Sequence, residues 1–544
     1  MRTDSRALLS IHGAVALLLS LLLPVAVAGD YTMEVLVVET PLHGANGMDF
    51  DADGNLIAGS MMNASVFRVD TETGAVETIV GPPRGVADDL AIGPDGTLVW
   101  TSTPFGIVHV LRPGGQVERL ATDLPMINSI NFTRDGRLFA AQVTVSGGNL
   151  YELDVTGQTE PRLVLEDLPG LNSFEIDDHD ILFGPLQWGG KIIRIDLKTA
   201  AVDDVATGFS RPVAVNFDSH GNLYAVDYLS GEIIRVDPAS GSKQVVAKVN
   251  PPIDNLAIDR DDRVYISQPC GNGIREVDTR TGAIRQVARG SIGMPGGAIL
   301  MQRNGRETLL VAGMLCQNFI DTQTGEFEAL PRQGETIWSG WLDYSNGTLV
   351  LSSLAFGQLQ WLDAATGQPR KTLSGFKAPY AVKIMPDNSV WMAEHGTGRI
   401  LRLTEAGGQA PEVLLDGLGG PVEFLVFENN KLYVSEADAG RVSMHDIDSG
   451  ERVVVIDNLD QPEGIDRLPD GRLLIAEVGA RRLIAVDTDT GAIEVIAENL
   501  PVGLPPFMGT AKTFLPTDVI VNPDGVIYLV SDIDHTVLKF TPSD

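Results

Sequence analysis

The sequence predicts an all-β fold, and three observations support this prediction. A pattern of four short apolar strands, separated by D-G-like and T-G-like turns, recurs twelve times and is clear in segments 46–80, 213–247 and 463–497. The repeats begin 40 to 44 residues apart, except for a last interval of 54. Strands of about five residues joined by such turns form antiparallel hairpins, and no convincing long helical pattern interrupts them.

Four strands in about 41 residues are typical of one blade of a β-propeller. Twelve blades exceed any usual ring, so we predict two tandem six-bladed β-propellers with four antiparallel strands per blade. The predicted parts are a signal peptide over residues 1–28, a first propeller over 29–283 and a second over 284–544. A lone strand at 35–38 is expected to close the sixth blade of the first propeller, and strand 284–288 to close the last blade of the second. The alternative is one propeller inserted into the other.

The first 28 residues have the order of a secretory signal peptide. Arg2 and Arg6 precede an apolar run over 14–23, and Ala26-Val27-Ala28 offers an A-x-A cleavage site. The alternative is an uncleaved membrane anchor, although the run is short for a span. Because no later stretch approaches 18 consecutive apolar residues, we expect an exported protein, periplasmic or secreted, with no stable membrane span after cleavage.

Charge and cysteine content exclude several classes. Lys and Arg number 40 against 72 Asp and Glu, which gives a formal net charge of −32 and argues against nucleic-acid binding. An apolar share of 44% excludes a disordered chain, and two cysteines exclude a disulfide-stapled mini-domain. Cys270 and Cys316 occupy equivalent positions in consecutive repeats, so either a disulfide between the propellers or two buried thiols fits the pattern.

Strand order predicts where a site lies, because every innermost strand starts at the same end of its ring. The opening positions of the first ring are Asn46, Asp88, Asn128, Asn172, Val213 and Asp254, with Asp89 and Asn255 adjacent. Those of the second ring are Gly296, Ser339, Tyr380, Val422, Glu463 and Thr517. Converging carboxylate and amide oxygens suit Ca²⁺ or another divalent cation. We therefore predict a metal site made by Asn46, Asp88, Asn128, Asn172, Asp254 and Asn255; the alternative is polar turns around a water-filled channel.

Several of these motifs resemble the six-bladed lactonase superfamily of gluconolactonase, senescence marker protein and paraoxonase. Segment 253–259, followed by VYISQPCGNG, is similar to the paraoxonase segment with an Asp-Asn pair of metal ligands. Leu171-Asn172-Ser173 resembles its L-N-D turn, and Asn46-Gly47-Met48 resembles the turn that carries an Asn ligand in gluconolactonases. Asp88-Asp89-Leu90 stands where the family has a Glu that binds the catalytic ion. The likeness covers residues 33–283.

The resemblance implies an exported Ca²⁺-dependent hydrolase that acts on a lactone or ester in the channel of the first propeller. A bound ion would polarise the carbonyl group and lower the pKa of a water, with Asp254 or His43 as the proton acceptor. Two departures weaken the match: Val213 replaces another Asn ligand, and Asp88 is shorter than the family's Glu. The paraoxonase His pair has no counterpart that we can locate. A non-catalytic propeller that binds a ligand or a protein is the first alternative.

A second alternative places the activity in the second propeller. Glu394 with His395, Glu436 and Glu477 end the second strands of successive blades, and the phrase around them resembles streptogramin B lyases. By that resemblance His395 would be the base of a Mg²⁺-dependent elimination, but the family's second His has no clear match. Each Glu could instead hydrogen-bond a neighbouring turn. The segment 500–515, rich in Pro and Gly, lies on the same face and could act as a lid.

Overall fold

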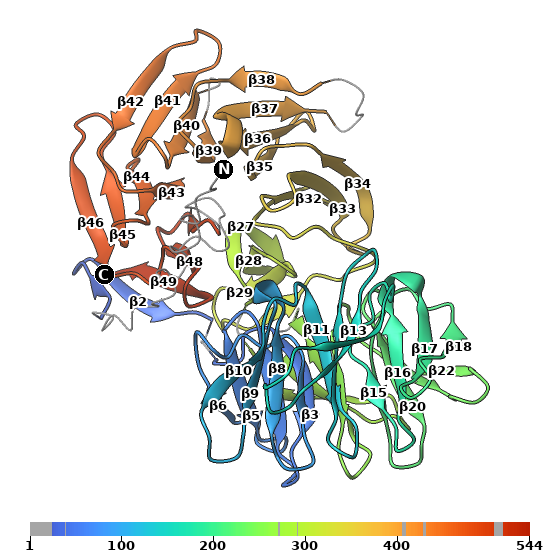
Figure 1. Ribbon diagram of the computed structural model, residues 1–544. Coiled ribbons are helices and arrows are strands. Elements are labelled where there is room, and N and C mark those ends of the chain that lie inside the picture. The colour runs from blue at the N-terminus through green and yellow to red at the C-terminus, as the bar shows by residue number, and fades with distance from the viewer. Residues whose placement is uncertain are drawn as a thin grey trace, which may run out of the picture.

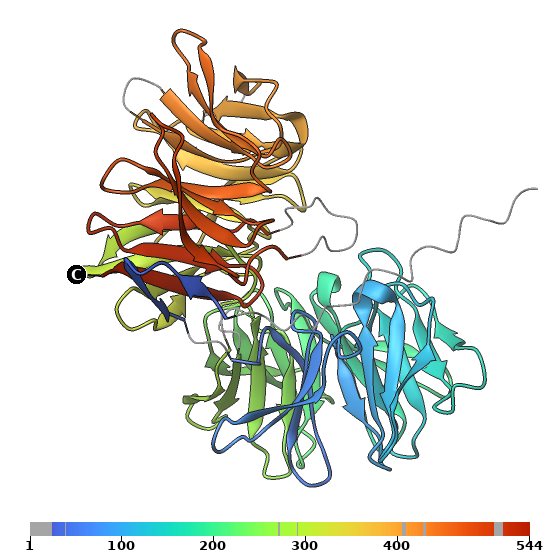
Figure 2. The same ribbon diagram turned by 90° about the vertical axis from the view of Figure 1, so that its left-hand side faces the viewer.

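The computed structural model describes residues 24–37, 40–269, 273–290, 292–404, 410–427, 431–504 and 515–543. These residues form two rings of β-sheets, the first coloured blue through green and the second yellow through red in Figure 1. Figure 2 shows the two rings set at an angle to each other. The predicted pair of six-bladed propellers is therefore confirmed. Among the described residues, no helix is long and apolar enough to cross a membrane.

Six four-stranded antiparallel sheets form the first propeller. From the innermost to the outermost strand they are β3 (Ala45–Phe50), β4 (Leu56–Ser60), β5 (Ser65–Val69), β6 (Val76–Val80); β7 (Leu90–Ile92), β8 (Leu98–Ser102), β9 (Ile107–Leu111), β10 (Val117–Ala121); β11 (Ile127–Phe132), β12 (Leu138–Gln142), β13 (Leu150–Leu153), β14 (Arg162–Leu165); β15 (Glu175–Ile176), β16 (Ile181–Leu186), β17 (Lys191–Asp196), β18 (Val202–Thr207); β19 (Pro212–Phe217), β20 (Leu223–Asp227), β21 (Glu232–Val236), β22 (Lys243–Lys248); and β23 (Leu256–Ile258), β24 (Val264–Gln268), β25 (Gly273–Val277), β26 (Ile284–Ala288). Because β23 packs against β3, the ring closes.

The second propeller also has six sheets, two of which take a strand from the N-terminal segment. They are β27 (Pro295–Arg303), β28 (Arg306–Gly313), β29 (Asn318–Asp321), β30 (Phe327–Ala329); β31 (Trp341–Ser345), β32 (Thr348–Ser353), β33 (Gln358–Asp363), β34 (Pro369–Ser374); β35 (Pro379–Ile384), β36 (Val390–Glu394), β37 (Arg399–Leu403), β38 (Glu412–Leu415); β39 (Pro421–Val426), β40 (Lys431–Glu436), β41 (Arg441–Asp446), β42 (Arg452–Ile456); β43 (Pro462–Arg467), β44 (Leu473–Glu477), β45 (Arg482–Val486), β46 (Ile493–Glu498), β1 (Ala26–Val27); and β47 (Val519–Val521), β48 (Ile527–Ser531), β49 (Thr536–Pro542), β2 (Tyr31–Val35). Contacts between β47 and β27 close this ring.

The predicted exchange of closing strands is wrong. The N-terminal strand β2 pairs antiparallel with β49 of the last blade, with Met33 opposite Phe540, and Figure 1 shows the blue strand beside the red one. Strand β26 pairs with β25 in its own blade. The first propeller is therefore continuous in sequence, and the N-terminal segment closes the second. Residues 1–23 of the predicted signal peptide lie outside the described residues.

Turn chemistry explains why each repeat folds into a blade. Asp70 directly follows β5, and its Oδ1 accepts hydrogen bonds from the backbone N–H groups of Glu72 (2.9 Å) and Thr73 (2.8 Å). Gly74 then adopts φ +74°, and a Cβ there would lie 2.3 Å from the carbonyl oxygen of Val287 in the neighbouring blade. Only glycine fits both conditions. The same Asp-to-backbone turn recurs at Asp196, Asp237, Asp278, Asp321, Asp363, Asp446 and Asp487.

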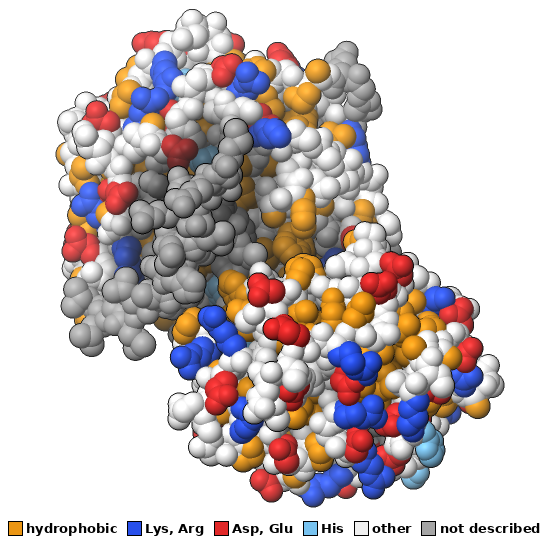
Figure 3. Space-filling model, in the orientation of Figure 1, with side chains coloured by type: hydrophobic (Ala, Val, Ile, Leu, Met, Phe, Trp, Pro, Cys, Tyr) orange, Lys and Arg blue, Asp and Glu red, His pale blue; other side chains and the backbone are white. Residues whose placement is uncertain are grey.

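The core consists of apolar layers between neighbouring blades. One layer joins the first and sixth blades of the first propeller through Leu56 and Phe67 on one side and Tyr265 on the other, all fully buried. A second layer packs Leu36 and Val37 against both end blades of the second propeller. Burial of each such side chain contributes about 1.5–3 kcal/mol to the free energy of unfolding. Figure 3 shows hydrophobic side chains gathered where the two rings meet.

Candidate functional site

The structure brings three of the predicted site residues into direct contact at the mouth of the first channel. Asn46 Nδ2 donates to Asp88 Oδ1 at 2.6 Å, and Asn128 Nδ2 donates to Asp88 Oδ2 at 2.7 Å. Asn172 lies next in the ring, where its Oδ1 accepts the Ser129 hydroxyl at 3.4 Å. The opening positions of adjacent blades therefore meet around the channel, as the strand order predicted.

Asp254 completes this cluster from the sixth blade. Burial, together with the charge of Asp88, raises the pKa of Asp254 to about 7. Burial also raises the pKa of Asp88, against the hydrogen bonds from Thr103, Asn128 and Asn46 that lower it. The two carboxyl groups thus lie near enough to interact, although the blades that carry them are not adjacent. We call Asn46, Asp88, Asn128, Asn172 and Asp254 the mouth cluster.

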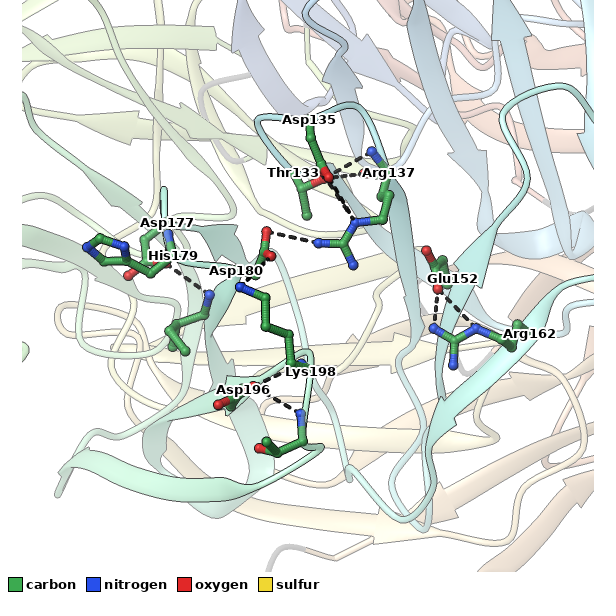
Figure 4. Close-up of polar contacts among 12 residues, drawn as sticks. Thr133, Asp135, Arg137, Glu152, Arg162, Asp177, His179, Asp180, Asp196 and Lys198 are labelled. Atoms are coloured by element: carbon green, nitrogen blue, oxygen red, sulfur yellow. Dashed lines mark hydrogen bonds and ion pairs between the residues drawn. The ribbon is translucent and has the colours of Figure 1, made fainter.

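The charge of the mouth cluster lacks a basic counterpart. Among the described residues, neither Asp88 nor Asp254 forms an ion pair, and no basic side chain contributes to either pKa shift. On the opposite face of the same ring, one half-buried turn acid has two basic partners. There Asp180 contacts Arg137 at 2.9 Å and Lys198 at 3.1 Å (Figure 4). Two buried carboxylates without a cation favour either a proton or a bound cation.

Asn255 lies one layer deeper than the mouth cluster. Its Nδ2 donates to Asp89 Oδ1 at 3.2 Å, and its Oδ1 accepts the backbone N–H of Leu256 at 2.8 Å and the Ser173 hydroxyl at 3.3 Å. Only 4% of Asn255 is exposed. The amide oxygen of this predicted ligand is thus directed to protein donors, so we assign Asn255 to the support of the channel wall.

Other acids of the channel have an evident structural task. Innermost strands of adjacent blades share no ladder, so their inward N–H groups need acceptors. Asp49 Oδ2 accepts the N–H of Ile92 from the next blade at 2.9 Å, and in the second propeller Asp466 Oδ2 accepts that of Val521 at 2.7 Å. Among the described residues, the side chains of Asp88 and Asp254 accept no such N–H group of an adjacent blade. The acids of the mouth cluster therefore differ from Asp49 and Asp466, which link neighbouring blades.

The far end of the first channel opens into a cavity of about 320 Å³ that sequence reasoning missed. Asp49, Asp89 and Glu175 line it. Burial raises the pKa of Asp49 to about 6, that of Asp89 to about 8 and that of Glu175 to about 8, and repulsion from neighbouring acids adds to all three shifts. The sequence signal for this cavity is the presence of acidic residues at inward positions of β3 and β15.

The second propeller carries a cation inside its own channel. Lys383 of β35 points its Nζ to within 3.8 Å of Glu423 Oε1. Burial alone would lower the pKa of Lys383, but the carboxyl groups of Glu423, Asp343 and Asp518 hold it above its usual value. Sequence reasoning missed this lysine, whose signal is a lone basic residue at an inward position of an innermost strand. In the first channel a basic residue, Arg134, also lines the cavity, but it follows β11 and pairs with the exposed Asp178 at 2.7 Å.

His43 does not join the mouth cluster in the way the sequence suggested. Its Nδ1 lies 3.1 Å from Nδ1 of His535, which precedes β49 in the last blade of the second propeller. Both rings are buried, at 5% and 7% exposed. The structure therefore places His43 in the contact between the propellers.

The glutamates of the second propeller bond to neighbouring turns. Glu394 Oε1 accepts the N–H of Lys377 at 2.9 Å, and Glu477 Oε1 accepts that of Asp460 at 2.9 Å. Glu436 accepts the N–H of Gly419 at 2.6 Å and is further held by two arginines, Arg441 and Arg452. All three carboxyl groups accept hydrogen bonds from backbone N–H groups of neighbouring turns. This favours the turn-bonding alternative over the lyase hypothesis.

His395 follows Glu394 in the short helix η4 (His395–Thr397). Its Nε2 lies 3.6 Å from Asp438 Oδ2, and its ring packs at 5.2 Å against that of Tyr380. Burial lowers the pKa of His395, and Asp438 opposes that shift. The imidazole is thus enclosed by one acid and one aromatic ring.

Cys316 is disulfide-bonded. The chain has one other cysteine, Cys270, which lies outside the described residues. The predicted lid segment 500–515 also lies mostly outside them, since only residues 500–504 and 515 are described.

The mouth cluster has the donor chemistry for a hard divalent cation. In the described part of the chain, no group of three or more His, Cys, Asp or Glu side chains is placed to hold a metal, so an ion here would depend on amide oxygens as well. Asp88 and Asp254 balance its charge. Asn172 Oδ1 already accepts the N–H of Ser173 at 2.8 Å, so it has one lone pair left for an ion. Asn46 and Asn128 both donate from Nδ2 to Asp88, so each amide would have to rotate to present its oxygen to the ion. The residues present fit such an ion.

Comparison with known proteins adds little beyond the architecture. No family model and no curated protein matches the chain. A crystal structure of a nidogen–laminin complex aligns at 19% identity and a TM-score of 0.37, over 40% of this chain and 85% of that one. The extracellular domain of a protein from B. thetaiotaomicron, described as a one-component system, aligns at 11% identity and a TM-score of 0.32, over 94% of this chain and 82% of that one. At these values neither likeness carries an argument about function.

Proposed function

We propose that the first propeller binds a divalent cation, Ca²⁺ by the chemistry of its donors, at the mouth cluster and hydrolyses a small lactone or ester there. The observation that carries the proposal is the pair Asp88 and Asp254, two buried and interacting carboxyls with no basic partner among the described residues. In the second channel Glu423 has Lys383 as a basic neighbour, which Asp88 and Asp254 lack among the described residues. The resemblance of the mouth motifs to gluconolactonase-type enzymes points to the same chemistry.

A divalent cation supplies Lewis acidity that polarises a carbonyl group and acidifies a neighbouring water. Asp88 is held by amide donors on both oxygens and is suited to charge balance. Asp254 accepts no side-chain hydrogen bond from the described residues, so one of its oxygens is available to take a proton from the attacking water. The water oxygen bonds to the carbonyl carbon, the ring C–O bond breaks, and the proton passes to the departing alkoxide. Because His43 faces His535, we assign proton transfer to Asp254 alone.

Binding is tested first, by calorimetric titration of the full-length protein with CaCl₂ after EDTA treatment and by the melting temperature with and without CaCl₂. We expect Ca²⁺ to raise the melting temperature of the wild type, and we expect no such rise for Asp254→Asn. Asp261→Asn, an exposed acid on the opposite face of the same blade, is the matched control and should behave as wild type. Equal responses in all three proteins would refute the cation site.

Catalysis is tested separately, because a non-catalytic binding propeller would also take up the ion. Opening of γ-butyrolactone is followed by pH-stat titration in CaCl₂ and in EDTA. The proposal predicts turnover only in CaCl₂, reduced at least tenfold in Asp254→Asn. Ca²⁺ binding without any turnover of this lactone or of simple esters would leave the binding alternative in place of the hydrolase.

A further inference from the structure

A segment of the second propeller contacts the loop that precedes Asp254 in the first propeller. This segment, residues 330–335, connects β30 with β31. Asn250, between the fifth and sixth blades of the first propeller, donates from Nδ2 to the carbonyl oxygen of Leu330 at 3.1 Å and accepts at Oδ1 from the N–H of Arg332 at 3.1 Å. The two propellers therefore meet at the loop that leads to Asp254, where the side chain of Asn250 holds the backbone at Leu330 and Arg332.

The guanidinium of Arg332 stacks on an aromatic ring of the first propeller. Its Cζ lies 5.6 Å from the ring centroid of Tyr228, and Cζ of Arg211 lies 5.7 Å from the same ring. Tyr228 directly follows β20, at the mouth end of the fifth blade, and it interacts electrostatically with Asp254 of the next blade. Arg332 of the second propeller thus packs on a tyrosine at the mouth end of the first propeller, one blade away from Asp254.

The two arginines differ in how their charge is satisfied. Arg211 forms an ion pair with Glu335 at 3.0 Å. Arg332 forms none among the described residues: its Nε donates to the carbonyl oxygen of Gly334 at 3.2 Å and its Nη1 to that of Leu315 at 3.2 Å. A guanidinium has five N–H donors in a planar fork, so these bonds leave donors for a further acceptor. A half-buried arginine whose bonds are all to neutral oxygens is suited to an anion.

We propose that Arg332 is a specificity residue of a composite site, and that the ligand is a small lactone or ester bearing a carboxylate that Arg332 binds while the carbonyl group reaches the mouth cluster. This inference rests on the proposed function. A carboxylate fits better than a phosphate monoester, because one guanidinium matches one negative charge and the nearby Asp88 and Asp254 repel a dianion more strongly. The second propeller then has a direct part in the chemistry of the first.

The alternative is that Arg332 only fastens the two propellers together. A fastening role would alter the handling of every ligand alike, whereas a specificity role changes the preference between a charged and a neutral ligand of the same shape. The first two probes are 5-oxotetrahydrofuran-2-carboxylate and the isosteric 5-oxotetrahydrofuran-2-carboxamide. The third is the phosphate monoester (5-oxotetrahydrofuran-2-yl)methyl phosphate. Their ring opening is measured by pH-stat titration with the full-length protein in CaCl₂.

We expect the wild type to show a kcat/KM at least tenfold higher for the carboxylate than for the carboxamide, and a lower value for the phosphate. In Arg332→Gln this ratio should fall to about one, mainly through KM for the carboxylate, and Arg332→Lys should restore part of it. Arg303→Gln, which removes an arginine paired with Glu328 elsewhere in the second propeller, is the matched control and should keep the wild-type ratio. A wild-type ratio near one, a ratio unchanged in Arg332→Gln, or a preference for the phosphate would overturn the proposal.

Failure of the proposed function gives a different result. If no probe is opened, calorimetric titration of the Ca²⁺-treated protein with the carboxylate and the carboxamide decides the matter. Tighter binding of the carboxylate in the wild type but not in Arg332→Gln supports the anion site without hydrolysis, and equal binding of both probes rejects it.

Discussion

His43 Nδ1 and His535 Nδ1 lie 3.1 Å apart, with their rings edge to face at a centroid distance of 4.9 Å. His43 stands where the chain enters the first propeller, and His535 lies in the last blade of the second, so this contact joins residues 492 positions apart. Burial lowers the pKa of His43 to about 4 and, with repulsion from His43, that of His535 to about 3. Both imidazoles are therefore neutral in the folded protein near neutral pH.

This pair should make the folded protein less stable as the pH falls. In the unfolded chain the two histidines become protonated below about pH 6.5, whereas in the folded protein they stay neutral down to about pH 4 and about pH 3. The free energy of unfolding therefore decreases as the pH falls through this range. Between pH 7 and pH 5 each histidine contributes a loss of about 2 kcal/mol. Urea unfolding of the wild type and of His43→Gln at the two pH values checks this, and the variant should lose about 2 kcal/mol less than the wild type.

His179→Gln is the control for this experiment, because His179 is exposed on a turn of the first propeller. It should retain the whole pH dependence of the wild type. An identical pH dependence in His43→Gln and the wild type would show that the buried pair does not titrate as described.

Lys383 is expected to be essential for the stability of the second propeller. The substitution Lys383→Met removes the cation that contacts the buried carboxyl of Glu423. The repulsion between Glu423 and Asp518 is then no longer balanced by a positive charge. Removing one partner from such a cluster costs about 3 kcal/mol. Because the remaining acids can take up protons at low pH, the loss should be larger at pH 8 than at pH 5.5. Guanidinium unfolding measures both values.

Lys198→Met is the matched control for Lys383→Met. Lys198 pairs with Asp180 on the surface, where its side chain is 66% exposed. Surface pairs contribute about 0–1 kcal/mol, so this variant should unfold close to the wild type at both pH values. Equal destabilisation by the two substitutions would contradict the role assigned to the second channel.

The blades could be predicted from local sequence signals, whereas the strand pairing that closes each ring could not. The Asp-to-backbone turn at Asp70 and the left-handed Gly74 are signals within a few residues, and the same signals mark most of the blades. Closure depends on which outermost strand meets which sheet edge. Strands β2 and β26 are both five residues long and half exposed, so nothing in their own residues distinguishes their partners. That choice follows from how the two rings sit against each other.

The mouth cluster was predictable for the same topological reason that His43 and Arg332 were not. Opening positions of successive blades must converge, so Asn46, Asp88 and Asn128 could be grouped from spacing alone. His43 is near Asn46 in sequence, but its ring turns to the other propeller. Arg332 belongs to a loop of the second propeller and reaches the first mouth only through the packing of the rings. Contacts between the rings carry no repeat signal.

The disulfide of Cys316 should be detectable by counting thiols. Under denaturing conditions without reductant, the wild type should give no free thiol and Cys316→Ser should give one, because the second cysteine of the chain then loses its partner. The free energy of unfolding should fall by about 2–4 kcal/mol in the variant. Thiol titration of protein exported to an oxidising compartment is compared with that of a reduced sample. Two free thiols in the oxidised wild type would contradict the bond.

Closure of the second propeller by β2 can be tested at one residue. Met33 pairs with Phe540 and packs into the core of the last two blades, whereas Thr32 on the same strand is exposed. Met33→Asp places a charge on that core and should cost about 2 kcal/mol, with Thr32→Asp close to the wild type. Hydrogen exchange measured by mass spectrometry should rise in peptides from β48 and β49 and stay unchanged in peptides from β25 and β26. Faster exchange in β25 and β26 would instead place the N-terminal strand on the first propeller.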